Sequence, residues 1–285
     1  MIGGLLIDKP AGWTSHDVVA AVRRALGTRA VGHAGTLDPF ATGLLIVLVG
    51  KATRLARYVE ALRKRYLATV RFGSATDTED LTGTVIAAST PDAWPAMDAM
   101  CDAASSLVGS RSQRPPAFSA KHVGGTRSHV LARRGEAVTL RDVTVQVHEV
   151  TVERWSPPDL DMAAVVGRGT YVRAMARELG ERCGIPAHCA ALRRAAIGPF
   201  SVEQAIAPTA VNRSHLIPAA ALLPALPSER IDAAAVREIS FGRAIPQREN
   251  AQGTGALLGE DGRLIATADG RDGIWHPVVV FEAPG

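Results

Sequence analysis

The hydrophobic positions of this chain change their spacing along the sequence, and each spacing predicts a different element. Residues 18–26 carry apolar side chains three and four positions apart, which is the period of an amphipathic helix. Thr14 precedes this run as a candidate N-cap, and Gly27 follows it as a stop signal. Residues 44–49 are apolar without interruption, as in a strand buried on both faces. Residues 66–72 alternate, which indicates a strand with one buried face.

The same patterns predict the other elements. Strands are expected at residues 5–7, 143–155, 162–166 and 190–197, and helices at 94–107 and 170–182. Residues 208–227 are rich in Ala and Pro, which indicates a connection with a short helix. From Ile231 onward, short apolar runs are separated by glycine turns, as in a small β-rich module. The sequence therefore predicts an α+β fold in which a small β-rich unit follows a large domain.

The charged residues are distributed unevenly. The chain has 285 residues, enough for one or two domains, and its composition is that of a globular protein. Its 32 basic and 28 acidic residues give a net charge of +4, which by itself indicates little. Basic residues gather at 23–29, 51–65, 111–141 and 168–194. Most charge runs are solvated surface, but such clusters are also typical of proteins that bind a nucleic-acid backbone.

Several other classes of protein and site are disfavoured. Cys101, Cys183 and Cys189 show neither a paired motif nor zinc-ligand spacing, so we expect reduced thiols. The acidic turn at 76–83 fits no calcium-loop pattern, and we expect no metal site. No secretion signal is recognisable, and the longest apolar run, 44–49, is too short to span a bilayer. We therefore expect a soluble, cytoplasmic protein without a membrane partner.

The segment from Gly32 to Gly43, which reads GHAGTLDPFATG, holds a single carboxylate, Asp38. Glycine allows the backbone to approach a ligand closely, so this segment can wrap around a guest and present Asp38 to it. The segment lacks the spacings of phosphate-binding loops. The alternative is structural, because Asp38 followed by Pro39 is also an ordinary helix start with Asp38 as the N-cap. The spacing alone does not choose between the two interpretations.

Other short motifs accompany this segment in order along the chain. They are Gly4–Pro10 with Thr14-Ser15, Gly50–Arg54, Lys64-Arg65-Tyr66, Gly73–Gly83, Ser119-Ala120-Lys121, Ala132–Gly135, Gly169–Arg173 and Leu192-Arg193-Arg194. With Gly32–Gly43 they cover about residues 3–200, and together they resemble the bacterial tRNA pseudouridine-55 synthases of the TruB family. A chance match over so many ordered motifs is implausible.

This resemblance implies a fold and a function. It implies a catalytic domain at 1–228, with a mixed, mainly antiparallel sheet flanked by helices and a basic RNA-gripping insertion at 110–141. Residues 229–285 would form a small PUA-like RNA-binding domain. The implied reaction converts uridine 55 in the T-loop of tRNA to pseudouridine after the base is flipped out, without a cofactor. The implied partner is the T-arm of tRNA, and a monomer is the default expectation.

Three residues carry the implied chemistry. Asp38 matches the catalytic carboxylate, which attacks the substrate as a nucleophile or stabilises cationic ribose as the glycosidic bond breaks. Arg173 is its implied partner, which keeps Asp38 ionised and orients it through a two-pronged hydrogen bond. Tyr66 is implied to lie over the target uracil, where its hydroxyl can take part in removing the C5 proton. The sequence leaves open whether Asp38 attacks the sugar or the base.

The resemblance also implies contacts with the substrate. His33 matches a histidine that assists extrusion of the base, and Tyr171 and Leu192 match residues that hold the base by shape. The remaining implied substrate contacts are Lys9, Lys121 and Arg133. Without the resemblance, residues of these types are more often core side chains or surface cations.

Two positions depart from the family pattern, because Phe118 and His129 stand where Tyr is common. Both lie in the implied insertion, so they bear on the grip on RNA and on substrate breadth. Other functions stay open: a guide-RNA-dependent relative, a tRNA-folding helper without catalysis, and a small-molecule glycosidase. The compact chain disfavours the first, and intact Asp38, Tyr66 and Arg173 disfavour the second. The single carboxylate of the motif disfavours the third. Isomerisation and folding assistance can also coexist.

Overall fold

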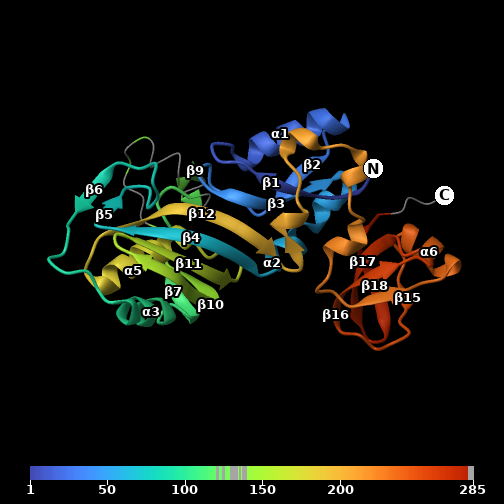
Figure 1. Cartoon of the computed structure of the whole chain (residues 1–285). Coiled ribbons are helices and arrows are strands. Elements are labelled where there is room, and N and C mark those ends of the chain that lie inside the picture. Colours follow the sequence, from blue (N-terminus) through green and yellow to red (C-terminus); the bar gives the residue numbers. More distant parts are fainter. Residues whose placement is uncertain (120–121, 124–125, 129–133, 135, 137–139, 282–285) are drawn as a thin grey trace.

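The computed structural model describes residues 1–119, 122–123, 126–128, 134, 136 and 140–281. Its body is a nine-stranded sheet (Figure 1). Along the sheet lie β1 (Gly3–Lys9), β3 (Thr42–Val49), β12 (Ala187–Ile197), β4 (Lys64–Phe72), β11 (Asp159–Val166), β10 (Val143–Ser156) and β7 (Gly109–Gln113). In addition, β2 (Val31–Ala34) pairs with β3, and β13 (Phe200–Ser201) pairs with β12. Among the described strands of this sheet, only β12 and β3 pair in parallel, so the mainly antiparallel sheet is confirmed.

The predicted helices are present, with one change in length. α1 (Ser15–Leu26) follows Thr14, whose hydroxyl accepts the backbone N–H of Asp17, and ends at Gly27 with a φ of 65°. α5 (Val172–Cys183) matches its prediction. α3 (Met97–Ser105) is shorter than predicted: Pro95 disfavours helical backbone at Trp94, and Ala96, which precedes the first helical residue, has an extended backbone. In the described part of the chain, no helix is long and apolar enough to cross a membrane.

Short elements connect these parts. They are the 3-10 turn η1 (Gly50–Leu55), helix α2 (Ala56–Ala61), the hairpin of β5 (Ser74–Thr76) and β6 (Val85–Ala88), the hairpin of β8 (His122–Val123) and β9 (Thr126–Arg127), and the 3-10 turns η2 (Val202–Gln204), η3 (Pro208–Ala210), η4 (Arg213–His215) and η5 (Ala219–Leu222). Residues 208–227 thus form three 3-10 turns where one short helix was predicted, because repeated prolines interrupt the helix. Residues 110–113, the start of the implied basic insertion at 110–141, belong to β7 and thus to the main sheet.

Helices α5 and α3 cover one face of the central strands, and the main core lies between them (Figure 1). Ala68, Val70 and Phe72 of β4 pack there against Met175 of α5 and Met100 of α3. The alternation predicted for residues 66–72 is therefore confirmed. This packing places the start of α5 beside β4 and β12.

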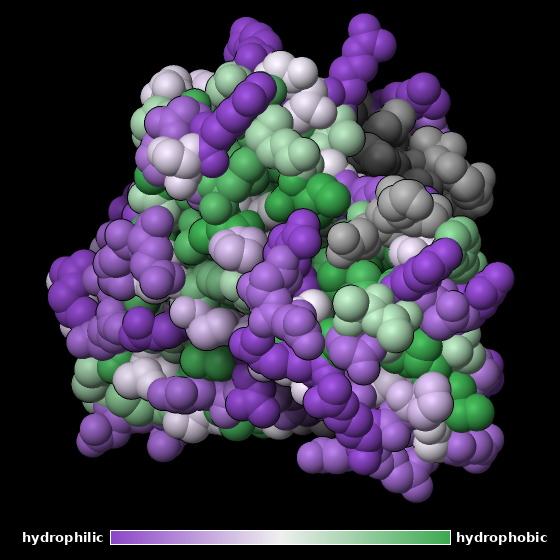
Figure 2. Space-filling model, turned by 90° about the vertical axis from the view of Figure 1, so that its right-hand side faces the viewer, coloured by the Kyte–Doolittle hydropathy of each residue, from purple (hydrophilic) through white to green (hydrophobic). Residues whose placement is uncertain are grey.

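A second, five-stranded sheet closes the described chain. Its order is β14 (Ser228–Arg230), β16 (Gly253–Leu258), β17 (Leu264–Arg271), β18 (Ile274–Val280) and β15 (Ile245–Pro246). The predicted β-rich unit is confirmed, and it also contains α6 (Ala233–Ser240), which was not predicted. Phe281 packs against the large domain, and its carbonyl accepts a hydrogen bond of 3.0 Å from Lys51. Figure 2 shows this end of the molecule, where hydrophilic residues surround smaller hydrophobic areas.

Candidate active site

Asp38 and Arg173 meet in the lining of a cavity of about 600 Å³. Nε of Arg173 lies 2.9 Å from Oδ2 of Asp38, and Nη2 donates to Oδ1 at 3.1 Å. Two guanidinium nitrogens therefore approach the carboxylate, but only the Nη2 contact is a hydrogen bond, because Nε of Arg173 has no hydrogen-bond partner among the described residues. The two-pronged hydrogen bond that the resemblance implies stays a prediction. Arg173 is only 2% exposed, whereas 34% of the Asp38 side chain is exposed. The buried cation therefore holds a carboxylate that a ligand in the cavity can reach.

Asp38 lies in a loop that no helix follows, so its interpretation as a helix N-cap is wrong. The hydroxyl of Ser15 holds this loop by accepting the N–H of Leu37 at 2.9 Å and donating to its carbonyl at 3.2 Å. At the end of the loop, Gly43 has a φ of 103°, and a Cβ there would lie 2.3 Å from the carbonyl oxygen of Arg194. Only glycine permits this close approach of β3 to β12.

Asp80 is a residue of the site that the sequence reasoning missed. Its Oδ2 atom lies 3.5 Å from Nη1 of Arg173, and the residue is 5% exposed. The hydroxyls of Thr78 and Thr82 donate to its Oδ1 atom at 2.8 and 2.6 Å. The sequence shows Asp80 in an acidic turn, which is usually solvated. The available signal was the threonines that flank it, since their hydroxyls satisfy a buried carboxylate.

Arg173 has two further partners that fix its direction. Nη1 donates to the carbonyl of Thr78 at 2.7 Å, and Nη2 donates to the carbonyl of Phe118 at 2.8 Å. The guanidinium is thus held by the acidic turn at 76–83 on one side and by the implied basic insertion at 110–141 on another. Phe118, one of the departures from the family pattern, contributes here through its backbone, which does not depend on the side chain.

The electrostatics of Asp38 combine opposing effects. Burial is the largest influence and raises the pKa of its carboxyl above the usual value. Arg173 opposes this rise, and Asp80 adds to it. Arg173 thus favours the ionised form, as predicted, but burial outweighs it. The Asp38 carboxylate is therefore protonated more readily than one in water.

Tyr66, Leu192 and Tyr171 line the same cavity as Asp38. Tyr66 is half-buried on β4 and stands opposite Arg194 in the register with β12. Leu192 lies two residues before Arg194, on the same face of β12. Tyr171 directly precedes α5. The structure thus brings five of the implied site residues, Asp38, Tyr66, Tyr171, Arg173 and Leu192, into one cavity lining. The aromatic and apolar surfaces of Tyr66, Tyr171 and Leu192 suit a flat, neutral ring.

His33 lies outside the lining of this cavity. It belongs to β2, and burial, followed by the charge of Arg194, lowers the pKa of its imidazole. Its part in extruding a base stays a prediction. Lys121, His129 and Arg133 lie outside the described residues, so their predicted RNA contacts also stay predictions.

Lys9 is fully buried at the end of β1 and does not line the cavity. Its ammonium donates to the carbonyls of Pro10, Trp13 and Pro39 at 2.9, 2.7 and 3.3 Å. Three acceptors use all three of its donors. Burial lowers the pKa of Lys9 to about 8, although Asp38 and Asp17 raise it. This position supports a role in holding the Asp38 loop rather than direct contact with substrate.

One part of the cavity lining is basic and comprises Arg57, Lys64 and Arg168. Lys64 is 7% exposed and donates to the carbonyl of Glu60. Burial lowers the pKa of Lys64 to about 8, and Arg194 and Arg168 lower it further, while Glu60 raises it. None of these three residues was predicted to contact the substrate, although all belong to the basic clusters of the sequence. Their place in the lining suits a ligand that carries phosphate.

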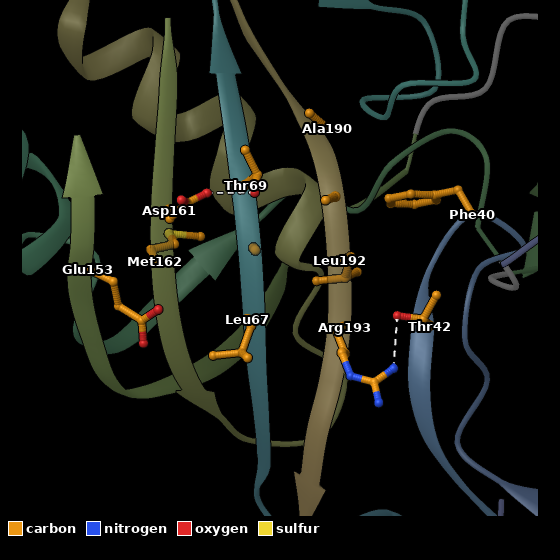
Figure 3. A pocket seen from close by; sticks show the side chains of 12 residues that line it. Phe40, Thr42, Leu67, Thr69, Glu153, Asp161, Met162, Ala190, Leu192 and Arg193 are labelled. Atoms are coloured by element: carbon orange, nitrogen blue, oxygen red, sulfur yellow. Dashed lines mark hydrogen bonds between the residues drawn. The ribbon is translucent and has the colours of Figure 1, made fainter. Parts of the chain in front are cut away.

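A second hollow, of about 330 Å³, shares residues of β4 and β12 but is lined by Thr69 and Arg193 (Figure 3). Thr69 donates to Asp161 at 2.7 Å, and Arg193 donates to both oxygens of Asp8 at 3.0 and 2.8 Å. Since side chains alternate along a strand, Arg193 and its neighbour Arg194 point to opposite faces of β12. The residues predicted to be catalytic gather in the Asp38 cavity and not in this hollow.

Comparisons with known proteins agree with this geometry. A family model described as "TruB family pseudouridylate synthase (N terminal domain)" matches residues 23–172, just over half of the chain. The chain belongs to the TruB family. A protein named tRNA pseudouridine synthase B from Thermobifida fusca (strain YX) is 43% identical over 98% of both chains. One of the same name from Nocardia farcinica (strain IFM 10152) is 41% identical over 100% of this chain and 95% of its own.

Membership of the TruB family makes this chain a pseudouridine synthase. A chain in the crystal structure of a Cbf5-Nop10-Gar1 complex superposes with a TM-score of 0.75, over 99% of this chain and 85% of that one. At 24% identity this likeness shows the fold alone, including the C-terminal β-rich domain expected to be PUA-like. Among the described residues, no group of three or more His, Cys, Asp or Glu side chains is placed to hold a metal ion.

Proposed function

We propose that this TruB-family chain converts uridine 55 in the T-loop of tRNA to pseudouridine, with Asp38 as the nucleophile. The observation that carries the proposal is the Asp38–Arg173 pair, which presents a fixed carboxylate to a cavity lined by Tyr66. The names of the related proteins, tRNA pseudouridine synthase B, support tRNA as the substrate. The shape of the folded T-arm is the feature by which RNA of this kind is recognised.

The reaction is an isomerisation. The bond between N1 of uracil and C1′ of ribose breaks, and C5 of the same base then bonds to C1′. The proton leaves C5 and N1 gains one, so the atoms balance and no cofactor is required. Asp38 forms a transient bond to C1′ of the ribose or to C6 of the uracil. In both routes the carboxylate must be ionised, and Arg173 favours that form.

The cavity supports the expulsion of the base from the RNA stack. Flipping a nucleotide costs a few kcal/mol, and stacking on an aromatic side chain returns about 1–3 kcal/mol. Tyr66 offers such a ring beside the carboxylate, while Leu192 and Tyr171 restrict the shape of the pocket. His33 assists by occupying the space that the base leaves.

The rest of the molecule supports binding of the RNA. Arg57, Lys64 and Arg168 form the basic part of the cavity lining, which supports binding of the phosphates beside the flipped nucleotide. Residues 110–141 form the gripping insertion, and the C-terminal domain, from residue 229, adds a second RNA-binding surface. The chain acts as a monomer in the cytoplasm.

The test uses an unmodified tRNA transcript and maps pseudouridine after incubation with the full-length protein. The wild type is expected to modify position 55 alone, and Asp38→Asn is expected to yield no product while it still binds tRNA. Asp8→Asn is the matched control, because it disrupts a similar Asp–Arg pair outside the cavity. Tight tRNA binding by a wild type that forms no product would contradict the proposal and favour a folding helper.

A further inference from the structure

Arg194 is a buried cation in the lining of the active-site cavity, and it is 1% exposed. Among the described residues, no carboxylate lies within ion-pairing distance of it. Its neighbour Arg193 differs, because it forms a two-pronged pair with Asp8. A buried charge without a counter-charge costs free energy, and an apolar side chain would fill the same space without that penalty.

The contacts of Arg194 are all to neutral oxygen atoms. Nε donates to the carbonyl of Leu44 at 2.7 Å, and Nη2 donates to the carbonyl of Gly35 at 3.0 Å. Nη1 lies 3.3 Å from the carbonyl oxygen of Thr36 and 3.4 Å from the hydroxyl oxygen of Tyr66. The three carbonyls belong to β3 and to the loop before Asp38, so they hold the guanidinium fixed. The Tyr66 hydroxyl is the one side chain among these contacts.

The positive charge of Arg194 acts on the surrounding groups. It contributes to the lowered pKa values of Lys9, His33 and Lys64, after the larger effect of burial. Three other basic groups are therefore made less stable in their charged forms by this arginine. Such an arrangement is unfavourable for the fold alone, which points to a use in the reaction.

We propose that Arg194 is a positioning residue that acts through the hydroxyl of Tyr66. The strand register already places the two residues opposite each other on β4 and β12. Because the hydroxyl oxygen accepts a hydrogen bond from Arg194, the Tyr66 ring is held at one angle beside the Asp38 loop. The hydroxyl can still donate its own hydrogen to a ligand in the cavity. This inference rests on the proposed role of Tyr66 against the flipped uracil.

The first test observes the contact without any measurement of activity. The chain has three tyrosines, so protein labelled with 3-fluorotyrosine gives three ¹⁹F NMR signals. Tyr66→Phe assigns one of them to Tyr66. Arg194→Lys is expected to shift that signal, while Arg193→Lys, the adjacent arginine on the opposite face, leaves it in place. A Tyr66 signal that does not respond to Arg194→Lys would overturn the proposal.

The second test measures the reaction with enzyme in excess over tRNA. Arg194→Lys is expected to lower the single-turnover rate about tenfold or more, with little change in tRNA affinity. Tyr66→Phe removes the contact from the other side and is expected to lower the rate as well. The double variant should then be no slower than the slower single variant. Independent, multiplicative losses, or a Tyr66→Phe protein with the wild-type rate, would overturn the proposal.

The two tests also separate this inference from the proposed function. If the wild type forms no pseudouridine at position 55, the proposed function fails while the NMR result still reports on the contact. If Arg194→Lys does not fold, Tyr66→Phe keeps the second test decisive, because it leaves Arg194 and its three carbonyl contacts intact.

Discussion

Asp80 lies 3.5 Å from Nη1 of Arg173, while the Nε and Nη2 atoms of the same guanidinium face Asp38. One buried arginine thus joins two acids that are far apart in the sequence. Asp80 is itself fixed by the hydroxyls of Thr78 and Thr82. The direction in which Arg173 presents itself to Asp38 therefore depends on a turn that does not reach the cavity lining.

Replacement of this second acid gives the first prediction. Asp80→Asn is expected to lower the single-turnover rate about 10- to 100-fold, because Arg173 loses a partner that orients it. Since Asp80 raises the pKa of Asp38, the acid limb of the pH–rate profile should also move to lower pH. Asp77→Asn, a more exposed residue of the same turn, is the control. An acid limb that moves upward in Asp80→Asn would contradict this account.

A second prediction concerns the shape of the cation at position 173. Arg173→Lys keeps the positive charge but cannot contact two carboxylate oxygens in a planar fork. We expect the rate to fall at least about 100-fold, with tRNA affinity within about threefold of the wild type, because the buried Arg173 is not among the residues proposed to meet phosphate. Rapid-quench measurements and filter binding check both values. Arg193→Lys controls for the general effect of the substitution, and a rate above one tenth of the wild type would show that charge alone is sufficient.

Periodicity predicted the strands and the cap signals predicted α1, because these features depend on residues that are neighbours in the sequence. Thr14 caps the start of the helix and Gly27 ends it, and both act through local contacts of the backbone. The pairing of Asp38 with Arg173 came instead from family resemblance. Those residues are 135 positions apart, and no local rule brings them together.

The residues that the sequence reasoning missed are polar groups buried by tertiary packing. Asp80 was predicted only as part of an acidic turn without a metal site, since its burial depends on α5 lying beside that turn. Arg194 was counted in a basic cluster, although strand alternation places it on the same face as Leu192. That alternation was the available signal. Lys9 was assigned to substrate, whereas the structure shows all three of its donors bonded to backbone carbonyls.

A third prediction links the chemistry of Asp38 to the stability of the fold. Its raised pKa means that the folded state binds a proton more readily than the unfolded state, so stability falls as pH rises from about 4 to the raised value. Asp38→Asn has no carboxyl group to titrate at this position, so its stability does not fall with rising pH for this reason. At neutral pH the variant should therefore be more stable than the wild type, and this difference should shrink as the pH falls toward 4. Urea unfolding at several pH values measures the difference.

The control for that experiment is Asp8→Asn. It breaks the partly exposed pair with Arg193, in which the side chains are 35% and 39% exposed, and it should cost at most about 1 kcal/mol. A gain of stability in Asp38→Asn that stays constant from pH 4 to pH 8 would be inconsistent with titration of Asp38.

The last prediction concerns Lys9, whose ammonium joins β1 to the loop that carries Asp38. Its pKa in the folded state is about 8, below the usual 10.5, so between these values the unfolded state binds more protons. The stability of the wild type should therefore rise with pH in this window relative to Lys9→Met, by on the order of 2 kcal/mol. Urea unfolding between pH 7 and pH 10 measures this difference, with Lys51→Met as the control for removal of a more exposed lysine. Because Lys9→Met also frees the carbonyl of Pro39 next to Asp38, its single-turnover rate should fall while tRNA affinity persists. A stability difference that is the same at every pH would mean that Lys9 keeps an ordinary pKa in the fold.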